Sequence, residues 1–364
     1  MMIPSPLLLL LRLLLLLGLA TASGMKELHG RYVTVRVGGG SECVVTDYGA
    51  KGDGKADDTR AIQAAFDHCG HSGGGTIIIP APKTFLIFSV HFTSNHQELH
   101  IEEGATLLGS DDIKAWDGGK VGSALIVAQP TGKDQKTMEH VAITGGGKVD
   151  GQGLLFWRGR VNNVFRPHTV DFKHVNTGMI TGPTFTRNPN HVLELYCDNC
   201  ELSYISVLNP PSTGVCEQTT TCSHNTDAVD VHGTPFYIHN VNFTTGDDNV
   251  AVHANHTLVE DSYFGTGHGA SIGSMCDESI TNLTVRNMTF VGTTSGCKIK
   301  AHPQCHGHVW DIKYYDIVMH GVQLPINLDQ CKSALLCIDY FAPRYCSFTD
   351  VKIKFQTMAF IQRR

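Results

Sequence analysis

Four short polar clusters recur between apolar, strand-like segments over residues 225–300, and their spacing constrains the fold more than any one cluster does. The clusters are Asn225-Thr226-Asp227, Gly246-Asp247-Asp248, Gly267-His268-Gly269 and Lys298-Ile299-Lys300. Counted from Asp227 to Asp248, His268 and Lys298 in turn, the intervals are 21, 20 and 30 residues. Each interval is close to one coil of a β-solenoid, the last lengthened by a loop, and equal positions on successive coils stack about 4.8 Å apart. Three carboxylates, one imidazole and two ammonium groups would then gather on one face.

The rest of the chain repeats short β-rich runs at a similar period. They occupy residues 76–79, 85–88, 99–101, 141–143, 170–172, 192–195, 250–252 and 270–272, with Gly, Asn, Asp and Pro between them. A β-sandwich would show clean apolar/polar alternation, and a TIM barrel would need a helix between strands. The pattern therefore predicts an all-β solenoid. The glycine-rich segment 145–153 lacks the Gly-Lys-Ser/Thr of a phosphate loop, so we interpret it as a tight corner between coils.

One helical stripe precedes these strands. Ile62, Ala65, Phe66 and Cys69 follow one another at i, i+3, i+4 and i+7, after Asp and Thr residues suited to cap a helix. Gly70 is placed to end the helix. Because repeat arrays need their open core covered, we expect this to be an N-terminal capping helix.

The first 24 residues have the pattern of a secretory signal peptide. Residues 7–19 are almost all leucine, and small residues follow directly. The run is short for a membrane-spanning helix, so we predict a cleaved signal at 1–24, a single domain over 25–364 and no membrane association after cleavage. The 12 cysteines then predict disulfides, and their even number leaves none necessarily free. Cys197-x-x-Cys200 has no second such pair, which favours a structural role over a zinc or redox site. Four sequons predict glycosylation: Asn242, Asn255, Asn282 and Asn287.

The charge composition favours a polyanionic partner at acidic pH. The formal net charge is −6, but the 20 histidines would largely be charged near pH 5, below their usual pKa of about 6.5. No Lys/Arg cluster with interleaved aromatic residues is present, so nucleic-acid binding fits poorly. No feature signals an oligomer, and we expect a monomer.

The four clusters contain the groups that glycoside hydrolysis requires. One carboxyl group must be protonated to donate to the leaving oxygen, and another must be ionised to activate water. Crowding of Asp227, Asp247 and Asp248 would raise at least one pKa by repulsion between like charges. Each cluster taken alone has a structural explanation, since Asp-Asp pairs also occur in turns. Their order and their coil spacing together favour a catalytic site.

With these motifs the sequence resembles the polygalacturonases of glycoside hydrolase family 28, which are right-handed parallel β-helices. Asn-Thr-Asp, Gly-Asp-Asp and Gly-His-Gly match that family's motifs intact, and Lys-Ile-Lys stands where the family has Arg-Ile-Lys. The resemblance implies a single-stranded right-handed parallel β-helix and hydrolysis of α-1,4-linked galacturonic acid in pectin, with inversion and without metal or cofactor. Such an enzyme would act outside the cell, at the cell wall.

The same resemblance assigns roles to individual residues. It makes Asp248 the general acid, Asp227 and Asp247 the pair that activates water, and His268 a residue that tunes the acid or contacts the sugar. Asn225, Lys298 and Lys300 would bind substrate. With sequence proximity, the family pattern also predicts three disulfides: Cys43–Cys69, Cys216–Cys222 and Cys331–Cys337. Stacked coils would place Asp227 and Asp248 about 5 Å apart, a separation typical of retaining enzymes; we follow the family and expect inversion.

Three departures from the family pattern keep alternatives open. Lys298 keeps a charge but lacks the bidentate fork of arginine, Asn249 stands where cysteine is frequent, and the family's tyrosine after Asp329-Gln330 is missing. A hydrolase of rhamnogalacturonan or xylogalacturonan, and a non-catalytic pectin-binding protein, both remain compatible with the sequence. A lyase fits less well because the site is rich in carboxylates. Exo and endo action are equally open.

Overall fold

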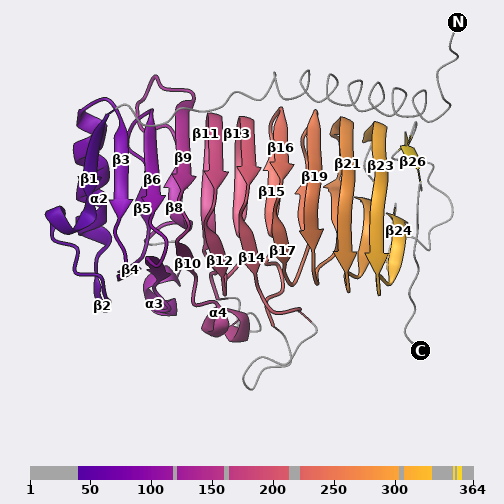
Figure 1. Cartoon of the computed structure of the whole chain (residues 1–364). Coiled ribbons are helices and arrows are strands. Elements are labelled where there is room, and N and C mark those ends of the chain that lie inside the picture. Colours follow the sequence, from indigo (N-terminus) through magenta and orange to yellow (C-terminus); the bar gives the residue numbers. More distant parts are fainter. Residues whose placement is uncertain are drawn as a thin grey trace, which may run out of the picture. The chain divides into compact units, whose positions relative to one another are not determined.

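The computed structural model describes residues 40–117, 121–159, 164–212, 222–302 and 307–329, and the strands at 347–348 and 351–354. Parallel strands stand side by side in sequence order (Figure 1), and each pairs with the equivalent strand of the next coil. Val250, for example, lies beside Ala270, Ala270 beside Cys297, and Cys297 beside Ile326. The architecture is a single-stranded right-handed parallel β-helix, and the fold prediction is confirmed.

The coils form three parallel ladders. The first, which we call the site sheet, contains β5 (Val90–His91), β8 (Ala124–Ala128), the start of β11 (His168–Thr181), the start of β13 (Leu193–Ser203), β15 (Val229–His232), β18 (Val250–Val252), β20 (Ala270–Met275), β22 (Ser295–Ala301) and β24 (Leu324–Asp329). The second contains β1 (Ser41–Val44), β3 (Gly75–Ile79), β6 (Gln97–Ile101), β9 (Met138–Thr144), the later parts of β11 and β13, β16 (Phe236–His239), β19 (Thr257–Phe264), β21 (Ser279–Val291), β23 (His308–His320), β25 (Ser347–Phe348) and β26 (Val351–Lys354). The third contains β2 (Asp53–Asp57), β4 (Thr84–Ile87), β7 (Thr106–Gly109), β10 (Lys148–Asp150), β12 (Thr184–Thr186), β14 (Ser206–Leu208), β17 (Asn242–Thr244) and the end of β19.

The core forms because apolar side chains at equal positions of successive coils stack inside the solenoid. The rings of Phe243 and Phe264 are 5.7 Å apart, and those of Phe264 and Phe290 are 5.2 Å apart. All three are fully buried. Burial of each such ring contributes about 1.5–3 kcal/mol, so the repeated register of these phenylalanines stabilises the stacking that positions the site.

Left-handed residues turn the long strands around the corners between sheets. In β21, Asn282 and Asn287 have φ of 56° and 50°, and in β23 Asp311 and Asp316 both have φ of 54°. Asn and Asp tolerate this region better than most side chains do. A single strand therefore bends twice and contributes to two sheets.

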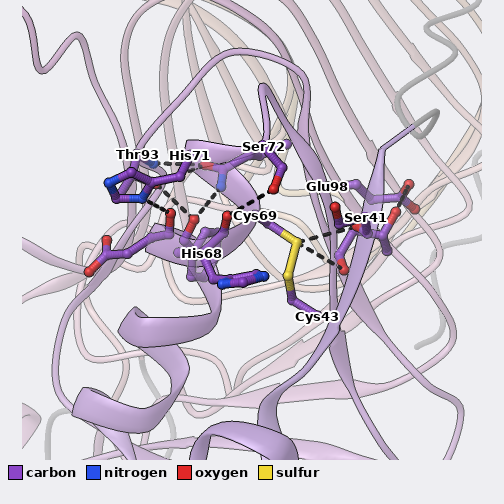
Figure 2. The surroundings of a disulfide bond; sticks show 12 residues. Ser41, Cys43, His68, Cys69, His71, Ser72, Thr93 and Glu98 are labelled. Atoms are coloured by element: carbon purple, nitrogen blue, oxygen red, sulfur yellow. Dashed lines mark hydrogen bonds between the residues drawn. A yellow bond between two sulfur atoms is a disulfide. The ribbon is translucent and has the colours of Figure 1, made fainter.

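The helix α2 (Thr59–His71) covers the N-terminal end of the core and buries the predicted stripe. The disulfide Cys43–Cys69 ties it to β1, as Figure 2 shows, which confirms that pairing. The helix continues through Gly70 to His71, one residue beyond the predicted end, and the left-handed turn falls on Gly73 (φ 86°).

Two short helices and a 3-10 turn complete the described elements: α3 (Ile113–Trp116), α4 (Leu154–Gly159) and η1 (Val45–Tyr48). The glycine-rich segment is a corner, because β9 ends at Thr144 and β10 begins at Lys148. No helix in the described part of the chain is long and apolar enough to cross a bilayer. The predicted signal peptide lies outside the described residues.

The described cysteines confirm part of the disulfide prediction. Cys197 and Cys200 form a disulfide, so their motif has a structural role. Cys222 is disulfide-bonded, but its predicted partner Cys216 lies outside the described residues, as do Cys331 and Cys337. Cys297 is free and buried. Its register neighbours on the adjacent strands are Ala270 and Ile326, so neither can form a disulfide with it.

Candidate active site

The four polar clusters meet on the site sheet. Asn225-Thr226-Asp227 immediately precedes β15, Gly246-Asp247-Asp248 precedes β18 and Gly267-His268-Gly269 precedes β20, while Lys298 and Lys300 belong to β22. Equal register positions run through Asp230, Ala251, Ser271, Lys298 and Asn327. Residues that are one coil apart in the sequence therefore lie side by side on neighbouring strands.

Asp248 is fully buried and is surrounded by groups that stabilise a carboxylate. Ser271 donates a hydrogen bond of 2.7 Å to Oδ1, and Lys298 Nζ lies 3.4 Å from the same oxygen. Lys300 Nζ donates to Oδ2. Burial lowers the pKa of Lys300, but the charge of Asp248, its hydrogen bond and the charges of Asp227 and Asp247 together outweigh burial, and the pKa is raised. In the free protein both lysines therefore form ion pairs with Asp248.

Asp247 accepts hydrogen bonds from two neighbouring coils. His268 Nδ1 lies 2.8 Å from Oδ1, and the backbone N–H of Asn225 donates to Oδ2 at 3.2 Å. Burial alone would raise the pKa of Asp247, but the hydrogen bond and charge of His268 hold it well below its usual range. Arg166 donates to the side-chain oxygen of Asn225 at 3.0 Å and so fixes that residue. The arrangement favours an ionised Asp247.

Asp227 has the opposite environment. It is 7% exposed, and burial, followed by repulsion from Asp230 and Asp247, raises its pKa well above the usual value. Within the described residues, its Oδ1 accepts no hydrogen bond. The crowded aspartates therefore differ in their preferred protonation, as like-charge repulsion predicts.

Behind Asp227 lies a group of residues that sequence reasoning missed. His191 Nδ1 is 2.9 Å from Glu194 Oε2 and 3.1 Å from Asp230 Oδ2, and its Nε2 is 3.6 Å from Asp227 Oδ1. The ring stacks on His168 at 5.1 Å. Burial lowers the pKa of His191, but hydrogen bonds to Asp230 and Glu194 outweigh burial and raise the pKa to about 11. The residue is thus a half-buried imidazolium among three carboxylates.

The strand register between β13 and β15 is the feature from which this group could have been predicted. Glu194 and Asp230 are paired positions that face outward from the solenoid. A residue-by-residue alignment of the coils places them together, although neither belongs to one of the four motifs.

A cavity of about 270 Å³ opens beside the lysines. It is lined by His268, Thr294, Ser295, Lys298, Lys300, Gln323, Leu324, Asn327 and Asp329. Two ammonium groups at its wall suit an anionic ligand. Asp247, Asp248 and His268 also offer ligand atoms within 4.8 Å of one another. A metal ion there would have to compete with the ammonium groups that already compensate Asp248, so the arrangement fits an anion better than a cation.

The chain is similar to known proteins over most of its length. Residues 69–343 match the model of glycosyl hydrolases family 28. The chain belongs to this family. A probable polygalacturonase of Arabidopsis thaliana is 28% identical over 298 residues, which cover 79% of this chain and 60% of that protein. The chain therefore spans about 60% of the length of that family 28 relative.

Solved structures share the fold. The polygalacturonase of Erwinia carotovora superimposes with a TM-score of 0.71 and 22% identity, covering 87% of each chain. An endo-xylogalacturonan hydrolase of Aspergillus tubingensis gives a TM-score of 0.72 and 22% identity, covering 86% of this chain and 84% of that one. These likenesses establish the β-helix fold of this family 28 member.

Proposed function

We propose that the protein is a secreted hydrolase of α-1,4-galacturonosyl bonds in de-esterified pectin, and that it inverts the anomeric centre. The observation that carries the proposal is the pair of lysines beside Asp248 at the wall of a cavity. A neutral sugar would leave these ammonium groups without a new partner, whereas a uronate supplies a carboxylate to them.

The divergent protonation of the aspartates supports general acid–base catalysis. Asp247, held ionised by His268, accepts a proton from the attacking water, and the neighbouring Asp227 holds the same water. The water oxygen bonds to the anomeric carbon as the glycosidic bond breaks. Asp248 gives its proton to the departing oxygen.

The free site places two cations against the candidate acid. The carboxylate of Asp248 lies beside the ammonium groups of Lys298 and Lys300. A substrate carboxylate entering the cavity would compete for the same ammonium groups. Substrate binding would therefore change the surroundings of the acid as well as position the sugar.

Secretion is part of the proposal. The disulfides Cys43–Cys69 and Cys197–Cys200 suit an oxidising compartment. The sequon residues Asn242, Asn282 and Asn287 are exposed, whereas Asn255 is half-buried and accepts a hydrogen bond from the backbone of Thr281. Glycan-dependent migration of the secreted protein on a gel, abolished by endoglycosidase, would test both secretion and modification.

The decisive experiment measures reducing ends released from polygalacturonic acid at about pH 5. We expect activity in the wild type and none in Asp248→Asn, with Asp111→Asn, a change at an exposed residue before α3, as the matched control. Loss of viscosity per bond cut then separates endo from exo action. Release from rhamnogalacturonan or xylogalacturonan alone would reassign the substrate, and binding without any shortening would indicate a non-catalytic pectin-binding protein.

A further inference from the structure

One histidine outside the four motifs lies in the same column of the solenoid as the aspartates of the site. The pairing of β13 with β15, continued back toward the turn, sets His191 beside Asp227, and that of β15 with β18 sets Asp227 beside Asp248. The backbone agrees, because the N–H of Val192 donates to the carbonyl oxygen of Asp227 at 2.9 Å and that of Ala228 donates to the carbonyl oxygen of Asp248 at 2.9 Å. His191 therefore occupies, one coil earlier, the position that carries a carboxylate on the next two coils.

The ring of His191 is held so that one nitrogen points at the site. Its Nδ1 lies 2.9 Å from Glu194 Oε2 and 3.1 Å from Asp230 Oδ2. One face of the ring stacks on His168, with 7° between the planes. Because Nδ1 and this face are both engaged, Nε2 is directed to Asp227 Oδ1 at 3.6 Å. The contact turns one oxygen of Asp227 toward the imidazole and leaves the other for water.

The anchor of the ring has partners of its own. Glu194 Oε1 lies 3.2 Å from His232 Nε2, and His168 Nδ1 lies 3.4 Å from Asp171 Oδ1. Imidazole and carboxylate groups thus alternate along the outer face of the site sheet. Glu194 therefore anchors the ring even when Asp230 is replaced.

Asp227 needs a positive charge because its other neighbours are acidic. Burial, followed by the charges of Asp230 and Asp247, raises its pKa, the charge of His191 opposes this rise, and Asp248 adds to it. Within the described residues no group donates a hydrogen bond to Oδ1. At 3.6 Å the imidazolium acts on this oxygen as a charge, since the separation is longer than a hydrogen bond.

The remaining cations of the site are each bound to another acceptor: Arg166 to Asn225, His268 to Asp247, and Lys298 and Lys300 to Asp248. Lys300 also acts on Asp227 through its charge, but its ammonium group is hydrogen-bonded to the neighbouring carboxylate. The contact with His191 is therefore the direct ionic contact that Asp227 makes among the described residues.

The chemistry of the attacking water requires an ionised Asp227. The water has two protons, and Asp247 accepts one of them as the oxygen bonds to the anomeric carbon. An ionised Asp227 accepts a hydrogen bond from the other proton and so leaves the oxygen lone pair free to attack. A neutral carboxyl group can instead donate its proton to the water oxygen, which would compete with the new bond.

We propose that His191 is a positioning residue of the site: its imidazolium, fixed by Glu194 and Asp230, orients the carboxylate of Asp227 toward the attacking water and offsets the acidic groups around it. The inference rests on the proposed function for the role of that water. It adds a residue outside the four motifs and predicts that this residue sets the acidic limit of activity.

The kinetic test follows kcat/KM on polygalacturonate against pH. In His191→Gln the acidic limb should move up by about one pH unit, the lower end of what an opposite charge within 4–6 Å does to a carboxyl group. Activity on that limb should fall about tenfold, with a smaller change at the plateau. His191→Lys retains a positive charge and should restore the limb. His239→Gln is the matched control, because His239 is also half-buried and paired with a carboxylate, Glu201, but lies on the second sheet.

A variant with the opposite sign separates charge from structural damage. Asp230→Asn removes a like charge beside Asp227 and should move the acidic limb to lower pH, whereas disruption of the site would not move it in opposite directions in the two variants. Asp230→Asn also tests the charge balance if His191→Gln does not fold. An acidic limb that stays in place in the folded variants, or a loss of activity that is equal at every pH, would overturn the proposal.

A titration without substrate separates this inference from the proposed function. The carboxyl carbon of Asp227, assigned through Asp227→Asn, is followed by carbon-13 NMR against pH in the wild type and in His191→Gln. A higher midpoint in His191→Gln supports the role of His191 even if the wild type hydrolyses nothing. Equal midpoints contradict that role even if the wild type is an active hydrolase.

Discussion

Lys300 and Asp248 form a buried ion pair that links the strand β22 to the turn before β18. The two side chains are 9% and 0% exposed, and they come from coils 52 residues apart in sequence. Their contact couples the stability of the solenoid to the chemistry of the site, since the same ammonium group neutralises the candidate acid and faces the cavity for an anionic substrate.

Removing this ammonium should destabilise the protein measurably. We expect Lys300→Met to lower the free energy of unfolding by about 3 kcal/mol, because breaking a buried pair leaves an uncompensated charge. The combined variant with Asp248→Asn should recover part of the loss. Urea denaturation provides the measurement. Lys313→Met is the matched control: its pair with Asp311 is 41% and 45% exposed, so the change should cost under about 1 kcal/mol. Equal losses in Lys300→Met and the control would refute the coupling.

His191 should make stability depend on pH in a defined direction. Its pKa is raised to about 11 in the folded protein, against about 6.5 when unfolded. A raised pKa stabilises the fold fully below pH of about 6.5, and the contribution is lost as pH rises towards the folded value. His191→Gln should therefore lower the free energy of unfolding by about 2 kcal/mol at pH 5, as expected for hydrogen bonds to charged groups, and by less at pH 9.

Urea denaturation at both pH values checks the His191 prediction. His302→Gln is the control, since that residue is exposed. A deficit that is the same at pH 5 and pH 9 would show that the ring acts only by packing.

Asn249, which stands where the family pattern has cysteine, should stabilise its turn by hydrogen bonds. Its buried amide donates to the carbonyl oxygens of Phe243 at 3.0 Å and Thr266 at 3.2 Å, and it accepts from the N–H of Gly269 at 2.8 Å. The oxygens of Phe243 and Thr266 also accept from other backbone N–H groups, but Asn249→Ala leaves the buried N–H of Gly269 without this acceptor. The change should therefore cost about 1–3 kcal/mol. Thermal denaturation would detect this, and a melting temperature equal to that of the wild type would contradict it.

The sequence predicted the solenoid because one period repeats in both the apolar runs and the polar clusters. It also placed Asp227, Asp247, Asp248 and His268 on one face, because each cluster occupies the same position in its coil. It could not predict that Lys298 and Lys300 would pair with Asp248, since a long side chain can turn to protein or to ligand from the same backbone position.

Residues outside the motifs were harder to find for a different reason. His191 lies two residues before β13, and it contacts Glu194 and also Asp230, which is 39 residues away in the sequence. Only the strand register brings them together. The end of α2 also depends on packing that the local sequence does not show. Local propensity predicts that the helix stops at Gly70, but packing against the core lets it continue to His71.

Restoring arginine at position 298 should test what the lysine has changed. Lys298 Nζ lies 3.4 Å from Asp248 Oδ1, and its side chain is only 14% exposed at the cavity wall. A guanidinium can bind a substrate carboxylate through two parallel hydrogen bonds, whereas an ammonium acts as a point charge. We expect Lys298→Arg to lower KM for polygalacturonate about three- to tenfold, a gain of about 1 kcal/mol, with a smaller effect on kcat. Steady-state kinetics at several substrate concentrations separates the two constants. Lys298→Gln, which removes the charge, should raise KM by a similar factor. If arginine instead raises KM while the protein unfolds like the wild type, the lysine is adapted to this site, and the cavity accommodates a carboxylate only when its partner is small.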